Sequence, residues 1–511
     1  MRRDPPGDPS TPDVLPAPGT VVGKRTRARV RSNLPWKFLL LFASGLLVLV
    51  SLSAILLDLR LKSGWTTVIT LLFATWVIVY LLASYKSHRS IYLFATAYLI
   101  SLAVFHLGQV LADGVGWFDL NSLHRGYMAP WHERAGWYIL LSFGCFGVGL
   151  ASAIKGGVKL SPADPIDSRK MDDNMRSVYW IGVALLCASL ASLVLLVGSV
   201  GNIFRFSRAE IFSGVGDTRG FGFFLLVAPS AMVLMVTGAR SRLQKRLAYP
   251  LAALMVLFIL FLGYRSSALF PALVGAIIWV KTGRRIPPMV AGAAIMVVLI
   301  AIPTVSTLRS LGAYKDLSGK DLSHSIEQSD IQEVFLQLGG TSTIVANVLR
   351  WVPKEDPYRY GQSYLLALRN AIPNIGLQIG ESERKQLQKK GLVTKESVRL
   401  MNPGDWYIYK TNPYLFEVGG GSGFSSIAEA YLNFGLPGVL AYFLLLGYLL
   451  ERLDQADLRS SRRLMIFSGA MLWPLLKTVR NVSGVFFKPV VFILVSIAIW
   501  KLIFIWNSRV R

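Results

Sequence analysis

Residues capable of chemistry gather in one stretch of the sequence, next to a long apolar run. The stretch runs from Asn412 to Leu453 and reads NPYLFEVGGGSGFSSIAEAYLNFGLPGVLAYFLLLGYLLERL. Backbone N–H groups of a glycine loop that leads into a helix can bind phosphate oxygens. Gly421 and Gly423 are the candidates here, although a flexible hinge explains such glycines equally well. The loop matches neither the P-loop nor the GxGxxG pattern, so a bound nucleotide is not indicated.

Two glutamates flank these glycines and offer different chemistry. Glu417 precedes the loop and is the freer candidate for a general base that deprotonates a hydroxyl. Glu429 follows Ser426 by three residues, which is capping-box spacing, so we expect its carboxylate chiefly to satisfy backbone donors where a helix begins. His324 lies near several carboxylates and could also transfer protons, although a solvated polar helix explains this cluster as well.

Four arginines outside the apolar runs form a second candidate group. They are Arg208, Arg265, Arg309 and Arg480. A guanidinium group can bind phosphate oxygens through two parallel hydrogen bonds. The alternative for each arginine is to extend toward lipid headgroups. Arg265 is the strongest candidate, because it sits in a tight turn between two short apolar runs that leave it little freedom to reach away.

The sequence does not predict metal chemistry. The histidines lack metal-ligand spacing. The two cysteines, Cys145 and Cys187, lie far apart inside apolar runs. We therefore expect no structural metal, no disulfide framework and no cofactor.

The composition is typical of a membrane protein with many spans. Of the 511 residues, 53% are hydrophobic and only 16% are charged. The net charge of +25 would suggest a nucleic-acid partner in a soluble protein. Here the basic residues lie in short clusters between apolar blocks, as the positive-inside rule expects, so nucleic-acid binding is not predicted.

The apolar blocks predict membrane-spanning helices. Ten blocks have the length of one span each, at residues 36–57, 65–83, 90–111, 136–154, 178–199, 221–238, 289–305, 425–450, 464–479 and 485–506. A further block, Tyr249–Val280, is too long for one span, and we expect two short spans that turn at Gly263–Arg265. With that turn, the basic clusters fall on the side of the amino terminus. We predict an all-α polytopic fold of about twelve spans with both termini in the cytoplasm.

This topology divides the chain into four parts. Residues 1–32 have the composition of a disordered cytoplasmic tail, residues 33–305 hold spans one to nine, and residues 425–511 hold the last three. Residues 306–424 lie between spans nine and ten and are expected to form one large external (periplasmic) segment with its own fold. The glycine loop and the four arginines then lie on the external side, where the positive-inside rule does not require basic residues.

Two passages resemble a known family. They are LGYRSSALFPALVGAIIW, Leu262–Trp279, and GSGFSSIAEAYLNFGLPGVLAYFLLLG, Gly421–Gly447. Together with the span count, they are similar to the Wzy-type O-antigen and exopolysaccharide repeat-unit polymerases, integral membrane glycosyltransferases of the GT-C-like class. The arginine at the family's turn between two apolar runs corresponds to Arg265. Its G-x-G-F-S-x-I-x-E-x-Y-x-N-F-G passage corresponds to residues 421–435.

The resemblance implies an inverting, metal-independent glycosyl transfer on the outer face of the bacterial inner membrane. A growing glycan would leave undecaprenyl pyrophosphate and join a hydroxyl of a second lipid-linked repeat unit. The arginines would stabilise the departing pyrophosphate, and Glu417, Glu429 or His324 would deprotonate the acceptor. The partners would be the lipid-linked donor and acceptor, membrane lipid, a chain-length regulator and a flippase.

Two other functions stay open from the sequence. A lipopolysaccharide-type O-antigen ligase has a similar layout and the same donor but a different acceptor. A transporter or flippase of lipid-linked sugars would be expected to show pseudo-repeats and charges near mid-membrane, and the sequence shows no repeat and few such charges.

Overall fold

The computed structural model describes most of the chain from residue 33 onward. The described residues are 33–61, 64–117, 119–120, 128–155, 168–200, 219–261, 264–287, 289, 292, 339–372, 384, 391, 393–417, 421, 423–458 and 461–510. The expected tail, residues 1–32, lies outside them, and so does nearly all of the expected ninth span, residues 289–305.

Long α-helices occupy the places of the other expected spans. They are α1 (Leu34–Leu56), α2 (Trp65–His88), α3 (Phe94–Gly114), α5 (Ala129–Ala153), α6 (Ser168–Val200), α8 (Arg219–Gly238), α9 (Arg242–Phe261), α10 (Arg265–Lys281), α20 (Ser426–Asp454), α21 (Arg462–Thr478) and α22 (Gly484–Val510). The described residues contain no strand. In this part of the chain, seven helices are long and apolar enough to cross a membrane. The predicted all-α polytopic fold is confirmed.

The long apolar block Tyr249–Val280 forms two helices, as predicted. α9 ends at Phe261 and α10 begins at Arg265. The N–H of Tyr264, just before α10, donates to the carbonyl of Ile259 in α9 at 3.1 Å. Arg265 is therefore fixed in the first turn of α10, at the end of that helix where the turn lies.

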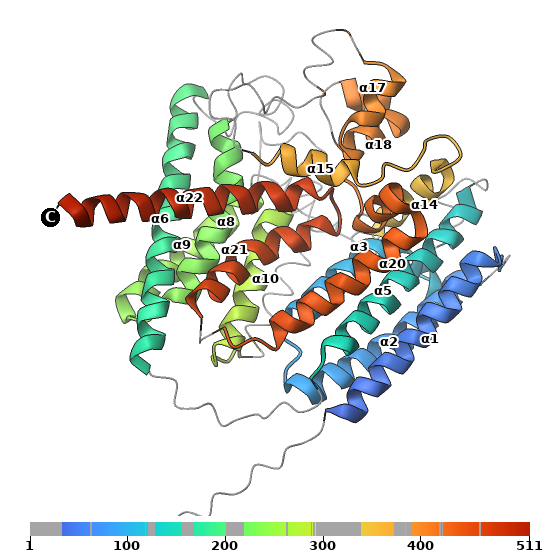
Figure 1. Cartoon of the computed structure of the whole chain (residues 1–511), viewed down its shortest axis with the longest axis horizontal. Coiled ribbons are helices and arrows are strands. Elements are labelled where there is room, and N and C mark those ends of the chain that lie inside the picture. The colour runs from blue at the N-terminus through green and yellow to red at the C-terminus, as the bar shows by residue number, and fades with distance from the viewer. Residues whose placement is uncertain are drawn as a thin grey trace, which may run out of the picture.

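Close approach of backbones holds the central helices together. Figure 1 shows α1, α2, α5 and α20 running side by side, with α5 between α1 and α20. A Cβ atom at Gly149 of α5 would collide with the carbonyl of Leu444 in α20, and one at Gly447 of α20 would collide with the carbonyl of Phe146. Small residues at such contacts let helix backbones approach each other closely. Van der Waals packing then holds the helices together, because lipid provides no hydrophobic driving force between them.

Five shorter helices lie in the expected external segment. They are α14 (Thr341–Trp351), α15 (Gln362–Arg369), α17 (Lys395–Leu400), α18 (Pro403–Thr411) and α19 (Pro413–Glu417). Trp351 of α14 packs edge-on against Trp406 of α18, with ring centroids 5.5 Å apart. α14 also packs on α5 and α20, so these helices rest on the membrane bundle near the start of α20 (Figure 1).

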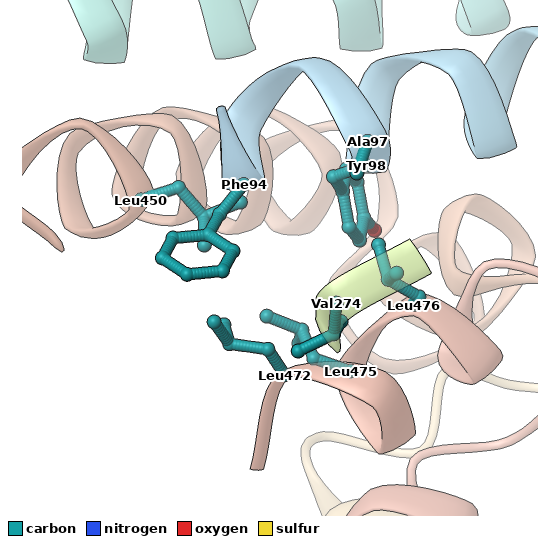
Figure 2. A pocket seen from close by; sticks show the side chains of 8 residues that line it. All are labelled: Phe94, Ala97, Tyr98, Val274, Leu450, Leu472, Leu475 and Leu476. Carbon is teal, nitrogen blue, oxygen red and sulfur yellow. The ribbon is translucent and has the colours of Figure 1, made fainter. Parts of the chain in front are cut away.

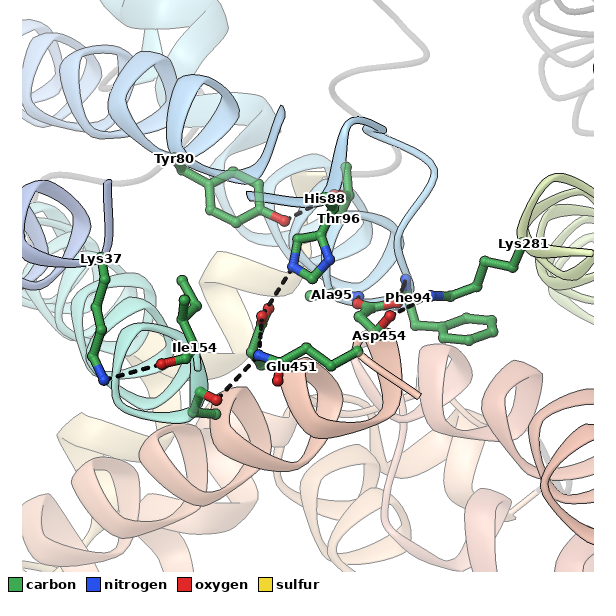
Figure 3. Close-up of polar contacts among 12 residues, drawn as sticks. Lys37, Tyr80, His88, Phe94, Ala95, Thr96, Ile154, Lys281, Glu451 and Asp454 are labelled. Atoms are coloured by element: carbon green, nitrogen blue, oxygen red, sulfur yellow. Dashed lines mark hydrogen bonds and ion pairs between the residues drawn. The ribbon is translucent and has the colours of Figure 1, made fainter. Parts of the chain in front are cut away.

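The opposite end of α20 is held by charge. The carboxylate of Asp454 accepts hydrogen bonds from the N–H groups of Phe94 and Ala95, each at 3.0 Å. It also pairs with the ammonium group of Lys281 at 3.2 Å. Figure 3 shows this Asp454 cluster beside a second pair, in which His88 lies 2.9 Å from Glu451. The cluster joins α20 to the start of α3 and the end of α10.

We expect Asp454→Asn to lower thermal stability strongly. The change removes the charge that pairs with the half-buried Lys281 and one acceptor of two buried N–H groups, and leaving buried donors unsatisfied costs about 1–3 kcal/mol each. Thermal unfolding of the purified protein in detergent measures the effect. The control is Asp173→Asn, which changes an exposed carboxylate in α6 and for which we expect a change within about 0.5 kcal/mol. Equal unfolding midpoints for the two variants would contradict this role.

Candidate functional site

The start of α20 is fixed by a buried histidine. Ser425 is the N-cap residue, and its hydroxyl accepts a hydrogen bond from the N–H of Ala428 at 3.2 Å. Nε2 of His106, a buried residue of α3, lies 2.7 Å from the same hydroxyl, and Nδ1 lies 3.2 Å from the carbonyl of Leu102. Because the carbonyl can only accept, Nδ1 carries the proton and Nε2 accepts from Ser425. One neutral tautomer therefore satisfies the whole chain of bonds.

The capping box expected at Glu429 is wrong. The N-cap residue is Ser425 and not Ser426, so Glu429 lies one residue beyond the N3 position. Its buried carboxylate instead accepts hydrogen bonds from partners distant in sequence. Oε1 accepts from the hydroxyl of Ser363 and from that of Ser483, each at 2.9 Å, and Oε2 accepts from the N–H of Ser483 at 2.7 Å. Glu429 thus joins α15, α20 and the beginning of α22.

Asn433, one turn further along α20, completes this Glu429 cluster. Its side-chain amide donates to the hydroxyl of Ser363 at 2.7 Å, and its side-chain oxygen accepts from the N–H of Gly361 at 3.0 Å. The backbone carbonyl of Asn433 accepts from the N–H of Tyr360 at 2.9 Å. That carbonyl is available because the residue four positions later is Pro437, which has no N–H.

Arg359 supplies a positive charge near this cluster. One of its guanidinium nitrogens donates to the carbonyl of Met401 at 2.6 Å, and the group lies 5.4 Å from the ring centroid of Trp406. Burial lowers the pKa of Arg359 to about 10, which leaves the guanidinium protonated at neutral pH. Attraction between the charges of Arg359 and Glu429 opposes that shift.

The glycine loop packs on the turn that carries Arg480. The N–H of Phe424 donates to the carbonyl of Arg480 at 3.1 Å. Gly423 has φ +78, and a Cβ atom there would lie 2.9 Å from that carbonyl oxygen. The guanidinium of Arg480 lies 5.4 Å from the ring centroid of Phe105 in α3. The turn between α21 and α22 is therefore held by the loop on one side and by Glu429, through Ser483, on the other.

A lysine that sequence reasoning missed connects the end of α21 to the first turn of α10, where Arg265 lies. Lys477 donates to the hydroxyl of Ser267 at 3.1 Å. Ser267 follows Arg265 by two residues in the first turn of α10, and Lys477 precedes Arg480 by three residues near the end of α21. Arg265 and Arg480 are both half-buried. The signal in the sequence was a single cation inside the apolar block 464–479.

The structure brings together part of the predicted set. Gly423, Glu429 and the backbone of Arg480 lie around the start of α20, and Arg265 is linked to them through Ser267 and Lys477. Glu417 is exposed at the end of α19, and Gly421 is exposed with open space around its Cα. Arg208, Arg309 and His324 lie outside the described residues.

An apolar pocket adjoins this polar site, because the hydroxyl of Tyr98 in its lining lies 3.5 Å from that of Ser426, where α20 begins. Figure 2 shows it between α3, α10, α20 and α21, lined by Phe94, Ala97, Tyr98, Val274, Leu450, Leu472, Leu475 and Leu476. Such a lining offers no group for proton transfer or phosphate binding except the Tyr98 hydroxyl. The candidate site is therefore the group of polar residues at the start of α20.

Fold and site define a class: an all-helical polytopic membrane protein with cations and carboxylates grouped at one end of its helices. A model of the family described as O-antigen polysaccharide polymerase Wzy matches residues 38–510. The chain belongs to this family, as the two sequence passages predicted. It is therefore a polymerising glycosyltransferase that acts on lipid-linked oligosaccharide repeat units.

One curated relative is similar over most of the chain. "Protein CapE" of Staphylococcus aureus is 22% identical over 375 residues, which cover 71% of this chain and 73% of that protein. No solved structure matches the chain.

We expect Gly423→Ala to reduce polymer and Gly421→Ala to leave it unchanged. At Gly423 a side chain meets the Arg480 carbonyl in a left-handed backbone conformation that costs about 1–2 kcal/mol for a non-glycine residue. At Gly421 nothing lies within 4 Å of the added Cβ atom. Polymer yield and length on gels, at matched protein abundance, measure the difference. Equal yields would show that the contact between loop and turn has no functional role.

Proposed function

We propose that the chain joins undecaprenyl-pyrophosphate-linked repeat units by inverting, metal-independent glycosyl transfer on the outer face of the bacterial inner membrane. The observation that carries this proposal is the hydrogen bond from Lys477 to Ser267, which brings the start of α10, where Arg265 lies, next to the end of α21, which Arg480 follows. Three cations at one end of a membrane bundle suit a ligand with two phosphates at the membrane surface. Both termini are then cytoplasmic, and the glycine loop is external.

The reaction is a single displacement at the anomeric carbon of the growing glycan. The bond from that carbon to the pyrophosphate oxygen breaks as the acceptor oxygen attacks from the opposite side, which inverts the configuration. The electron pair leaves on pyrophosphate, where Arg265, Lys477 and Arg480 offer donors already in place. Such preorganised donors stabilise developing negative charge without reorganisation during the reaction.

The two glutamates divide the remaining work. The acceptor hydroxyl must lose a proton, and Glu417 is exposed, so it can accept that proton and release it to water. Glu429 is buried and already accepts three hydrogen bonds. We assign Glu417 as the base and Glu429 as a positioning residue that holds the Arg480 turn through Ser483. Phosphate binding stays a prediction for Gly421, Arg208 and Arg309, and proton transfer stays a prediction for His324.

We expect Arg265→Ala nearly to eliminate long polymer and Arg265→Lys to retain a small fraction. Losing one donor to a developing oxyanion costs about 3 kcal/mol, a rate loss on the order of 100-fold. Lysine keeps the charge but not the planar fork. Single repeat units should accumulate on the lipid carrier in both variants, as extracted glycolipids would show.

The control for this experiment is Arg242→Ala, an exposed arginine at the start of α9. It should leave polymer unchanged. Normal polymer from a stably expressed Arg265→Ala variant would remove Arg265 from the mechanism.

Glu417→Gln should abolish polymer at normal protein abundance, because the amide cannot accept the proton. Glu396→Gln, which changes another exposed glutamate in α17, should have no effect. The polymerase activity of Glu429→Gln should fall together with its thermal unfolding midpoint. Glutamine has only one side-chain oxygen, so it cannot accept all three hydrogen bonds from Ser363 and Ser483. The two roles would be reversed if Glu417→Gln were active while Glu429→Gln were inactive with an unchanged thermal unfolding midpoint.

A further inference from the structure

Helix α15 has two chemically different faces. One face is buried: Ser363 donates to Glu429 at 2.9 Å, and Leu366 and Ala367 are also buried. A Cβ atom at Gly484, where α22 begins, would lie 3.7 Å from the Cβ of Ala367. In Figure 1, α15 lies beside the beginning of α22. This face therefore belongs to the protein interior and touches the Glu429 cluster.

The other face of α15 is apolar and exposed. Leu365 is 69% exposed, Leu368 is 49% exposed, and Ile372 just beyond the helix is 57% exposed. Their spacing of three and four residues puts them on one stripe. Three neighbouring aliphatic side chains so exposed to water would be costly, and such a patch marks an interaction surface.

The stripe continues into the surface of a membrane helix. Phe434 of α20 is 46% exposed, and its ring lies 3.1 Å from the position of a Cβ at Gly361, the N-cap residue of α15. α20 is one of the helices long and apolar enough to span a bilayer. Arg369 ends α15 and is exposed, so a cationic side chain stands where the stripe would meet lipid headgroups. Aliphatic residues on one face and a cation beside them are typical of a helix that lies in a membrane interface.

We propose that α15 is an interfacial helix, with Leu365, Leu368 and Ile372 resting in the boundary layer of the lipid bilayer. The partner of this surface is the membrane itself. Given the proposed function, α15 then stands between the lipid phase and Glu429, and a lipid-linked substrate that enters sideways from the bilayer passes it. Ser363 connects the lipid-facing helix to the carboxylate that holds the Arg480 turn.

Spin labels on single cysteines in the full-length protein test this placement. Cysteines at Leu365 and Leu368 are labelled in a Cys187→Ser background, reconstituted in liposomes, and compared for collision with oxygen and with a water-soluble nickel chelate. Two positions calibrate the measurement: Lys395→Cys, exposed on α17, and Leu254→Cys, 63% exposed on the membrane helix α9. We expect both α15 labels to collide more with oxygen than with nickel, as at position 254. Nickel accessibility equal to that at position 395 would overturn the proposal.

A functional measurement separates this proposal from that of the reaction. Leu365→Glu with Leu368→Glu should reduce polymer, because charge expels α15 from the interface and disturbs the Ser363–Glu429 bond, whereas Leu365→Met with Leu368→Met should not. Undiminished polymer from the glutamate variant would contradict the interfacial role, while the effect of Arg265→Ala would still support the polymerase mechanism.

Discussion

The break in α20 is the constraint from which the site follows. Gly435 adopts φ 64 inside the helix, and Pro437 has no N–H, so the carbonyls of Leu432 and Asn433 lose their helical partners. At the level of a membrane, backbone groups without water must be satisfied by the protein itself. The N–H groups of Arg359 and Tyr360 supply the two bonds, each at 2.9 Å. The segment before α15 is thereby tied to α20, and Ser363 is brought to Glu429.

Glu429 then connects elements that lie far apart in the sequence. Its two oxygens accept hydrogen bonds from Ser363 and Ser483, which lie 66 and 54 residues away in the sequence. Ser483 follows Arg480 by three residues, so the carboxylate helps to position a turn whose Arg480 carbonyl Gly423 approaches from the other side. A single buried charge therefore orders the loop, the turn and α15 together, and removing it would affect all three.

Sequence reasoning found the helices and the turn at Arg265, because apolar length and basic clusters are local signals. It placed the N-cap one residue too late, since Ser425 and Ser426 are equally good caps and only His106, from a different helix, selects Ser425. The partners of Glu429 left no local signal, as its three hydrogen bonds come from segments far away in the chain. Lys477 gives only a weak local signal, a single cation inside an apolar block, because its partner Ser267 lies on another helix.

The two ends of α20 are held by interactions of different strength. At Asp454 a full charge is paired with Lys281 and two N–H groups, an arrangement that is expensive to disrupt once buried. At the other end, the N-cap and its histidine make neutral hydrogen bonds, each contributing about 1 kcal/mol, and the Glu429 carboxylate adds three hydrogen bonds beside them. The glycine loop before the N-cap is less constrained than either cluster, because nothing lies within 4 Å of a Cβ atom added at Gly421. α20 can therefore stay anchored at Asp454 and at Glu429 while that residue adjusts its position.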